Sequence, residues 1–255
     1  MNNNIKYSLS DVRNSIIPGS DRYWVFRFII RPLSNYVTVP FLNLGFSANQ
    51  ISFFRLFLVF LSFLIINIPG YNAQLVAVTI ICFSIILDCV DGNICRVKNS
   101  ASFFGKFVDG IVDGIFVSFF PLFLGLSLFV EHASAYWIFI GILCCIVSLI
   151  SQWITARYNI FLKLVNHLTE TKSNESREHN FKQKEKIKRF ISSALVTGTV
   201  TIPIFLVIPS YGKELSLVAY MVCQVFCDIT LIILTYIEAR TTLAWWRKSV
   251  QSAKQ

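Results

Sequence analysis

The chain reads Asp88-Cys89-Val90-Asp91-Gly92-Asn93-Ile94-Cys95-Arg96 and, after eight further residues, Gly105-Lys106-Phe107-Val108-Asp109-Gly110-Ile111-Val112-Asp113. This stretch places four aspartates beside apolar runs in a chain that is 55% hydrophobic. Asp88 and Asp91 are three residues apart, and Asp109 and Asp113 are four apart, so on helices each pair lies on one face. Two such faces brought together would present four carboxylates, which suit hard divalent cations.

Long apolar runs predict an all-α membrane protein. Charged residues make up 15% of the chain, against about 25% in soluble domains. Apolar runs of about 20 residues are typical of transmembrane helices. We predict six spans, at Gln50–Ile68, Gln74–Leu87, Phe107–Val130, Trp137–Thr155, Phe190–Ile208 and Leu215–Ile237. The second is short, and we expect it to continue through Asp88 if that part lines a polar cavity rather than lipid.

The basic residues predict the orientation of these spans. All of the 23 Lys and Arg residues except Arg55 and Lys213 fall at one side of the predicted membrane. The positive-inside rule then places both termini and the four aspartates in the cytoplasm, and we expect a bacterial cytoplasmic membrane. The net charge of +9 sits at the ends of apolar spans, so anionic lipid headgroups are the expected partner rather than nucleic acid.

The flanking segments complete the expected organisation. We expect a loose cytoplasmic arm (1–20), an interfacial helix region (21–46), a six-span domain (47–240) with its acidic motif at 88–113, and a cytoplasmic tail (241–255). Region 21–46 interleaves aromatic and aliphatic residues with arginines, which predicts an amphipathic helix lying in the membrane interface. Pro32 and Pro40 are expected to break it.

Three polar residues within the predicted spans leave alternatives open. Arg55 could reach back to cytoplasmic headgroups or face the same polar cavity as the aspartates. Gln224 and Asp228 lie four residues apart in the last span. An ionisable group there suggests a functional site, although a hydrogen bond to a neighbouring helix is the simpler interpretation.

A carboxylate cluster at the membrane surface is compatible with several functions. Two divalent ions held close together stabilise both the attacking and the leaving oxygen of a phosphoryl displacement. A carboxylate can also accept a hydroxyl proton. The same cluster would suit an ion transporter or a divalent-cation channel, so the residue types alone do not choose between these classes.

The order Asp-x2-Asp-Gly-x2-Cys-Arg-x8-Gly-x3-Asp-x3-Asp resembles the signature of the CDP-alcohol phosphatidyltransferase family. That signature has Ala at the position of Cys95. Upstream, Arg31-Pro32-Leu33-Ser34 and Ser47-Ala48-Asn49-Gln50-Ile51-Ser52 look like the N-terminal region of the family. The family usually has Pro where this chain has Ala48.

The resemblance implies a reaction and a set of partners. A CDP-linked alcohol, often CDP-diacylglycerol, gives its phosphoalcohol group to an acceptor alcohol and CMP leaves, in phospholipid or related polar-lipid synthesis. The family is generally a homodimer with six spans preceded by a short interfacial helix. A divalent-cation transporter, or a CDP-linked polar alcohol used with a lipid acceptor, is the alternative.

The resemblance also assigns roles to residues of this chain. Asp88, Asp91, Asp109 and Asp113 would hold two divalent ions, usually Mg²⁺ with Mn²⁺ as a substitute, and Asp113 would be the general base toward the acceptor hydroxyl. The CDP pocket would be shaped by Gly92, Arg96 and Gly105. Arg157 is our candidate for binding the acceptor, and an ordinary positive-inside residue is the alternative for it.

Overall fold

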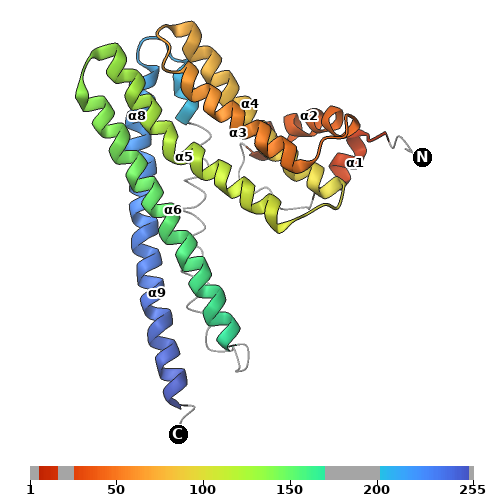
Figure 1. Cartoon of the computed structure of the whole chain (residues 1–255), viewed down its shortest axis with the longest axis vertical. Coiled ribbons are helices and arrows are strands. Elements are labelled where there is room, and N and C mark those ends of the chain that lie inside the picture. Colours follow the sequence, from red (N-terminus) through yellow and green to blue (C-terminus); the bar gives the residue numbers. More distant parts are fainter. Residues whose placement is uncertain (1–5, 17–25, 170–201, 253–255) are drawn as a thin grey trace.

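In the computed structural model every regular element of the described residues (6–16, 26–169 and 202–252) is helical. Figure 1 shows these helices. The α-helices are α1 Leu9–Asn14, α2 Arg31–Asn43, α3 Ala48–Ile65, α4 Tyr71–Val97, α5 Phe103–His132, α6 Ala135–Thr169, α8 Gly212–Ala219 and α9 Phe226–Ser252. Short π-helical turns occupy Phe26–Ile30 and Tyr220–Val225, and a 3₁₀ helix occupies Ile202–Val207.

Five helical segments of the described chain are long and apolar enough to cross a membrane, which makes this a multi-pass membrane protein. They are Ala48–Ile65, Tyr71–Val97, Phe103–His132, Ala135–Leu164 and Gly212–Arg240. The second runs through Asp88 and Asp91, as expected from the sequence. Most of the predicted span Phe190–Ile208 lies outside the described residues, so the count of six stays a prediction.

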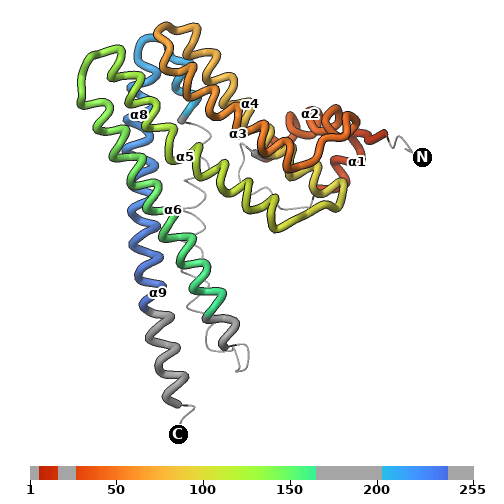
Figure 2. Tube along the Cα trace, in the orientation of Figure 1, coloured from red at the N-terminus to blue at the C-terminus, as the bar shows by residue number. Residues whose placement is uncertain are grey.

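Helix α5 links the two parts of the helix bundle. Helix α5 contacts α3 and α6, and α6 contacts α9. Figure 2 shows the same arrangement, with α5 running from the α3–α4 pair to α6 and α9. Glycines permit the close approach of α5 and α6, because a Cβ on Gly125 would lie 2.6 Å from Trp137 O, and one on Gly141 2.7 Å from Pro121 O. This packing fixes the position of the acidic face of α5.

A buried polar contact holds the helices together at the end of the bundle opposite the aspartates. The Lys213 ammonium donates to Ser127 Oγ at 2.7 Å and also pairs with Glu131. Ser127 Oγ in turn donates to Ile66 O at 2.7 Å. The buried charge of Lys213 is therefore compensated, and α8, α5 and the end of α3 are joined.

The N-terminal arm is more ordered than predicted. Residues 9–14 form helix α1, whereas we expected a loose segment. Ser8 and Asp11 form a reciprocal capping box, and Val12 is fully buried. The hydrogen bonds from Ser8 lower the pKa of Asp11. Burial of one apolar residue, together with this cap, explains why the short helix persists.

Helix α2 lies in the predicted interfacial region, whose position at the membrane stays a prediction, and the expected break at Pro40 is wrong. Pro32 lies in its first turn, where proline is tolerated, and Pro40 lies inside the helix without ending it. Ser34, Asn35 and Thr38 are buried on the side facing α4, whereas Leu33 and Tyr36 are exposed. The polar side of α2 thus faces the protein, and its apolar side faces outward.

Candidate functional site

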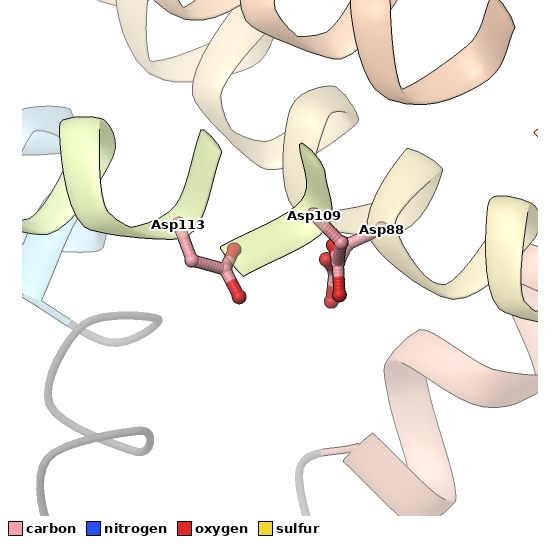
Figure 3. A group of neighbouring side chains, drawn as sticks. All are labelled: Asp88, Asp109 and Asp113. Carbon is pink, nitrogen blue, oxygen red and sulfur yellow. The ribbon is translucent and has the colours of Figure 1, made fainter. Parts of the chain in front are cut away.

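Three aspartates from two helices form an acidic cluster. Asp88, Asp109 and Asp113 each offer a carboxylate oxygen, and these oxygens lie within 4.8 Å of one another. Figure 3 shows Asp88 extending from α4 and the other two from α5, with all three side chains pointing into the same space. The spacing of four residues in α5 gives Asp109 and Asp113 a common face, as predicted.

Arg55 of α3 lies among these three carboxylates. Its Nη1 is 2.5 Å from Asp88 and 3.0 Å from Asp109, and its Nη2 contacts Asp113. The side chain is 6% exposed, so the guanidinium is buried against the cluster. Of the two interpretations of Arg55, the structure supports the one in which it faces the acidic cavity.

Asp91, the fourth predicted ligand, lies outside this group of three. It is buried one turn further along α4, where Ser52 Oγ donates to its Oδ2 at 2.7 Å. Helix α3 therefore meets the acidic helix with two polar residues, Ser52 and Arg55, on one face. The box of four equivalent carboxylates expected from the sequence is, in this structure, a cluster of three with Asp91 beside it.

The predicted CDP-binding residues lie near the end of α4 and the start of α5. The Arg96 side chain folds back along its own helix. Its guanidinium lies so close to Gly92 that a Cβ built on that glycine would be 3.4 Å from Arg96 Nη1. A Cβ on Gly105 would lie 3.0 Å from Asn49 Oδ1, so this glycine permits close packing of the starts of α5 and α3. Cys95, which stands at the usual Ala position, is a partly buried free thiol.

A cavity of about 580 Å³ opens beside the acidic cluster. Arg55, Asp88 and Asp113 form one wall. Across from them are polar residues of the last helices and α6: Ser151, Gln152, Thr155, Asn159, Gln224 and Asp228. Asp228 Oδ2 accepts the expected hydrogen bond from a neighbouring helix, from Ser148 Oγ at 2.8 Å, and Asp228 also lines the cavity.

Arg157 is not among the described residues that line this cavity. It is exposed on α6, and its guanidinium lies 5.7 Å from the centre of the Trp153 ring. It lines a second, apolar cavity of about 520 Å³ with residues of α6 and α9, among them Tyr158 and Tyr236. The structure does not bring Arg157 together with the acidic cluster.

Two further polar residues of the site had no assigned role from the sequence: Ser52 was not singled out as a site residue, and Gln224 was named only as a polar residue of the last span. Ser52 lies three residues before Arg55, and that spacing was a signal that both share a helix face. Gln224 is 3% exposed and lines the cavity, and within the described part of the chain it has no hydrogen-bond partner. It sits in the π-helical turn Tyr220–Val225, a distortion that is frequent at functional sites and that residue spacing does not predict.

The arrangement matches a known family along most of the chain. The family model for CDP-alcohol phosphatidyltransferase matches residues 46–225, from the cap of α3 to the π-helical turn. The chain belongs to the CDP-alcohol phosphatidyltransferase family. All three clustered aspartates, Arg55 and Gln224 lie within the matched part of this family member.

A curated relative gives a more specific comparison. The chain is 30% identical over 97 residues to a CDP-diacylglycerol–glycerol-3-phosphate 3-phosphatidyltransferase of Wigglesworthia glossinidia brevipalpis. The match covers 38% of this chain and 50% of that relative, so the chain spans about half the length of the protein that it matches.

The acidic cluster of this CDP-alcohol phosphatidyltransferase family member has the right chemistry for a divalent metal. Three carboxylate oxygens converge from two helices, and carboxylates are the hard ligands that Mg²⁺ and Mn²⁺ prefer. Arg55 already shows that a cation is stable in their midst. These residues could therefore hold a divalent ion.

Proposed function

We propose that this protein transfers a phosphoalcohol group from a CDP-linked alcohol to an acceptor alcohol and releases CMP, in phospholipid or related polar-lipid synthesis. The observation that carries the proposal is the convergence of Asp88, Asp109 and Asp113 beside a polar cavity, in a chain of this family. The name of the relative from Wigglesworthia favours CDP-diacylglycerol as the donor.

In this proposal Asp88, Asp91, Asp109 and Asp113 hold two divalent ions, with Mg²⁺ as the expected metal. When bound, such ions would neutralise the charge of the donor diphosphate and of the oxygen that leaves with CMP. Ser52 would orient Asp91 through its hydrogen bond at 2.7 Å, and Arg55 would balance the remaining negative charge of the cluster.

Asp113 is the proposed general base. Its side chain is 53% exposed, against 41% for Asp109 and 29% for Asp88, and it lines the cavity. An acceptor hydroxyl in the cavity would give its proton to the Asp113 carboxylate. The acceptor oxygen would bond to the phosphorus that carries the donor alcohol, and the bond from that phosphorus to the oxygen of CMP would break.

The donor nucleotide would bind where Gly92, Arg96 and Gly105 lie. A guanidinium group binds phosphate oxygens through paired hydrogen bonds, so Arg96 is suited to the diphosphate. The two glycines leave room for close neighbours there: Gly92 for the Arg96 guanidinium and Gly105 for Asn49. We further propose that this end faces the cytoplasm, that anionic headgroups surround it, and that the protein is a homodimer, because basic residues flank the spans on that side and the resembled family is dimeric.

We propose that the acceptor occupies the cavity and hydrogen-bonds to Gln224. Gln224 is buried and lines the cavity, and its amide can both donate and accept hydrogen bonds, as a hydroxyl-bearing ligand requires. This assignment uses a residue that lines the acidic cavity, whereas Arg157 lines the other one.

Gln224→Met is therefore expected to raise the KM for the acceptor about 3- to 10-fold, because one hydrogen bond is lost. The KM for the CDP-linked donor should be unchanged. Gln74→Met is the matched control, because Gln74 is also buried but donates to Leu206 O at 2.6 Å, far from the cavity. An unchanged acceptor KM in Gln224→Met would exclude this contact.

The reaction itself is tested by giving purified protein CDP-diacylglycerol, Mg²⁺ and a panel of alcohols, and measuring CMP. We expect CMP to appear in equal amount to a new phospholipid, and to stop on addition of EDTA. A second panel with CDP-linked polar alcohols and lipid acceptors covers the reverse assignment of donor and acceptor. Failure of both panels to release CMP would refute the proposed function.

A further inference from the structure

Asn93 is a fully buried residue of α4 that connects Arg96 to α2. Its Oδ1 accepts hydrogen bonds from Arg96 Nη2 at 2.6 Å and from Arg31 Nη1 at 3.3 Å. On the other side of the amide, Nδ2 donates to Thr38 Oγ1 at 3.0 Å and to Asn35 Oδ1 at 3.2 Å. One side chain therefore joins two guanidinium groups and two polar residues of another helix.

The chemistry of these partners fixes the orientation of the amide. Guanidinium groups only donate hydrogen bonds, so the atom of Asn93 that faces Arg31 and Arg96 must be its oxygen. The NH₂ group then faces two acceptor oxygens on α2. Rotation of the amide would lose both sets of bonds at once. Because the amide is bonded at both its oxygen and its nitrogen, Asn93 holds its partners in one geometry.

The polar side of α2 is built to match Asn93. Arg31, Ser34, Asn35 and Thr38 recur at intervals of three and four residues, which places them on one face of the helix. Ser34 and Thr38 are fully buried against α4. The opposite side of α2 is apolar and exposed, so its polar side chains are the ones that are buried. Buried polar groups need hydrogen-bond partners inside the protein, and Asn93 supplies them.

The network lies next to the acidic motif. Asn93 follows Asp91 by two residues, and the Arg96 guanidinium lies over the backbone of Gly92. Arg31 and Arg96 share a single acceptor atom, so two cationic groups are held side by side at the end of α4. Paired guanidiniums are well suited to an anion with several oxygens, such as a diphosphate.

We propose that Asn93 is a positioning residue for the donor, which holds Arg96 and Arg31 as a two-arginine clamp for the diphosphate of the CDP-linked alcohol. The proposal rests on the proposed function and extends it, because it makes α2 part of the donor site. Arg31 comes from α2 directly, and Thr38 and Asn35 fix the amide that orients both arginines. Preorganisation of this kind lowers the cost of binding rather than the barrier of the chemical step.

Asn93→Ala is expected to raise the KM for the donor about 10-fold and to leave kcat within about twofold, because the shared acceptor of two charged donors is lost. The Kd of CDP, which carries the diphosphate, should rise by a similar factor when measured by calorimetry in the presence of Mg²⁺. Asn67→Ala is the matched control: Asn67 Nδ2 donates to Phe63 O near the opposite end of α3, and its loss should not change either value.

A second pair of variants keeps α4 intact. Thr38→Val removes one acceptor for Asn93 from α2 and is expected to raise the donor KM about threefold, whereas Thr38→Ser keeps the hydroxyl and should behave as wild type. Wild-type donor KM and CDP affinity in both Asn93→Ala and Thr38→Val would overturn the clamp while leaving the proposed function intact. Absence of CMP release from the wild-type protein would instead overturn the proposed function.

Discussion

Asp113→Asn is expected to lower kcat for CMP release by about 10²- to 10⁴-fold, the usual contribution of a positioned general base. The amide keeps the size of the side chain but cannot take the proton of the acceptor hydroxyl. Single-turnover CMP release measures the step directly, and calorimetry with CMP should show that nucleotide still binds. The large effect is expected because Asp113 is the most exposed carboxylate of the cluster and lines the cavity.

Two controls separate the loss of the base from other effects of Asp113→Asn. Glu214→Gln also exchanges a carboxylate for an amide, but Glu214 pairs with His132 at the opposite end of the bundle, so it should retain activity. Titration with Mg²⁺ shows whether lost metal affinity explains the defect. Near-wild-type turnover in Asp113→Asn would remove Asp113 from the role of base.

Arg55→Gln is expected to lower the melting temperature of the metal-free protein by about 6–12 °C. Removal of one partner from a buried charge cluster costs about 3–5 kcal/mol, and we take the lower end because two of the aspartates are partly exposed. Mg²⁺ should restore most of the loss, since a divalent ion can replace the guanidinium among Asp88, Asp109 and Asp113. Thermal unfolding in detergent with EDTA and with Mg²⁺ measures both effects.

Lys213→Met is the matched control for Arg55→Gln. It also removes a buried cation from a carboxylate partner, Glu131, but at the end of the bundle away from the cluster. Its melting temperature should fall as well, and Mg²⁺ should not restore it. Equal recovery of the two variants by Mg²⁺, or recovery of neither, would show that Arg55 and a metal do not share the same carboxylates.

Sequence periodicity predicted the parts of this fold that depend on a single helix. Apolar runs located the five described spans, and the spacing of Asp109 and Asp113 placed both on one face of α5. The continuation of the second span through Asp88 was also predicted, because polar residues can occupy a span where it lines a cavity.

What the sequence could not supply depends on how one helix is rotated against another. Asp91 lies three residues from Asp88, yet packing against α3 gives it Ser52 as a partner and leaves it outside the cluster of three. The packing of α3 against α4 also makes Arg55 face the aspartates. From its position near the start of α3, its side chain could equally have reached the lipid headgroups. The surroundings of α2 were unpredictable for a related reason: its polar face has the same spacing whether it meets water or, as here, α4.

We propose above that Asp88, Asp109 and Asp113 hold cations, which would bind the diphosphate of a CDP-linked substrate. Anomalous diffraction from crystals grown with Mn²⁺ and CDP tests this most directly, because it locates manganese independently of the protein phases. We predict manganese peaks in contact with these carboxylates and with the diphosphate of CDP. Manganese bound elsewhere, or CDP bound with its diphosphate away from the three aspartates, would show that these carboxylates do not bind the substrate through metal ions.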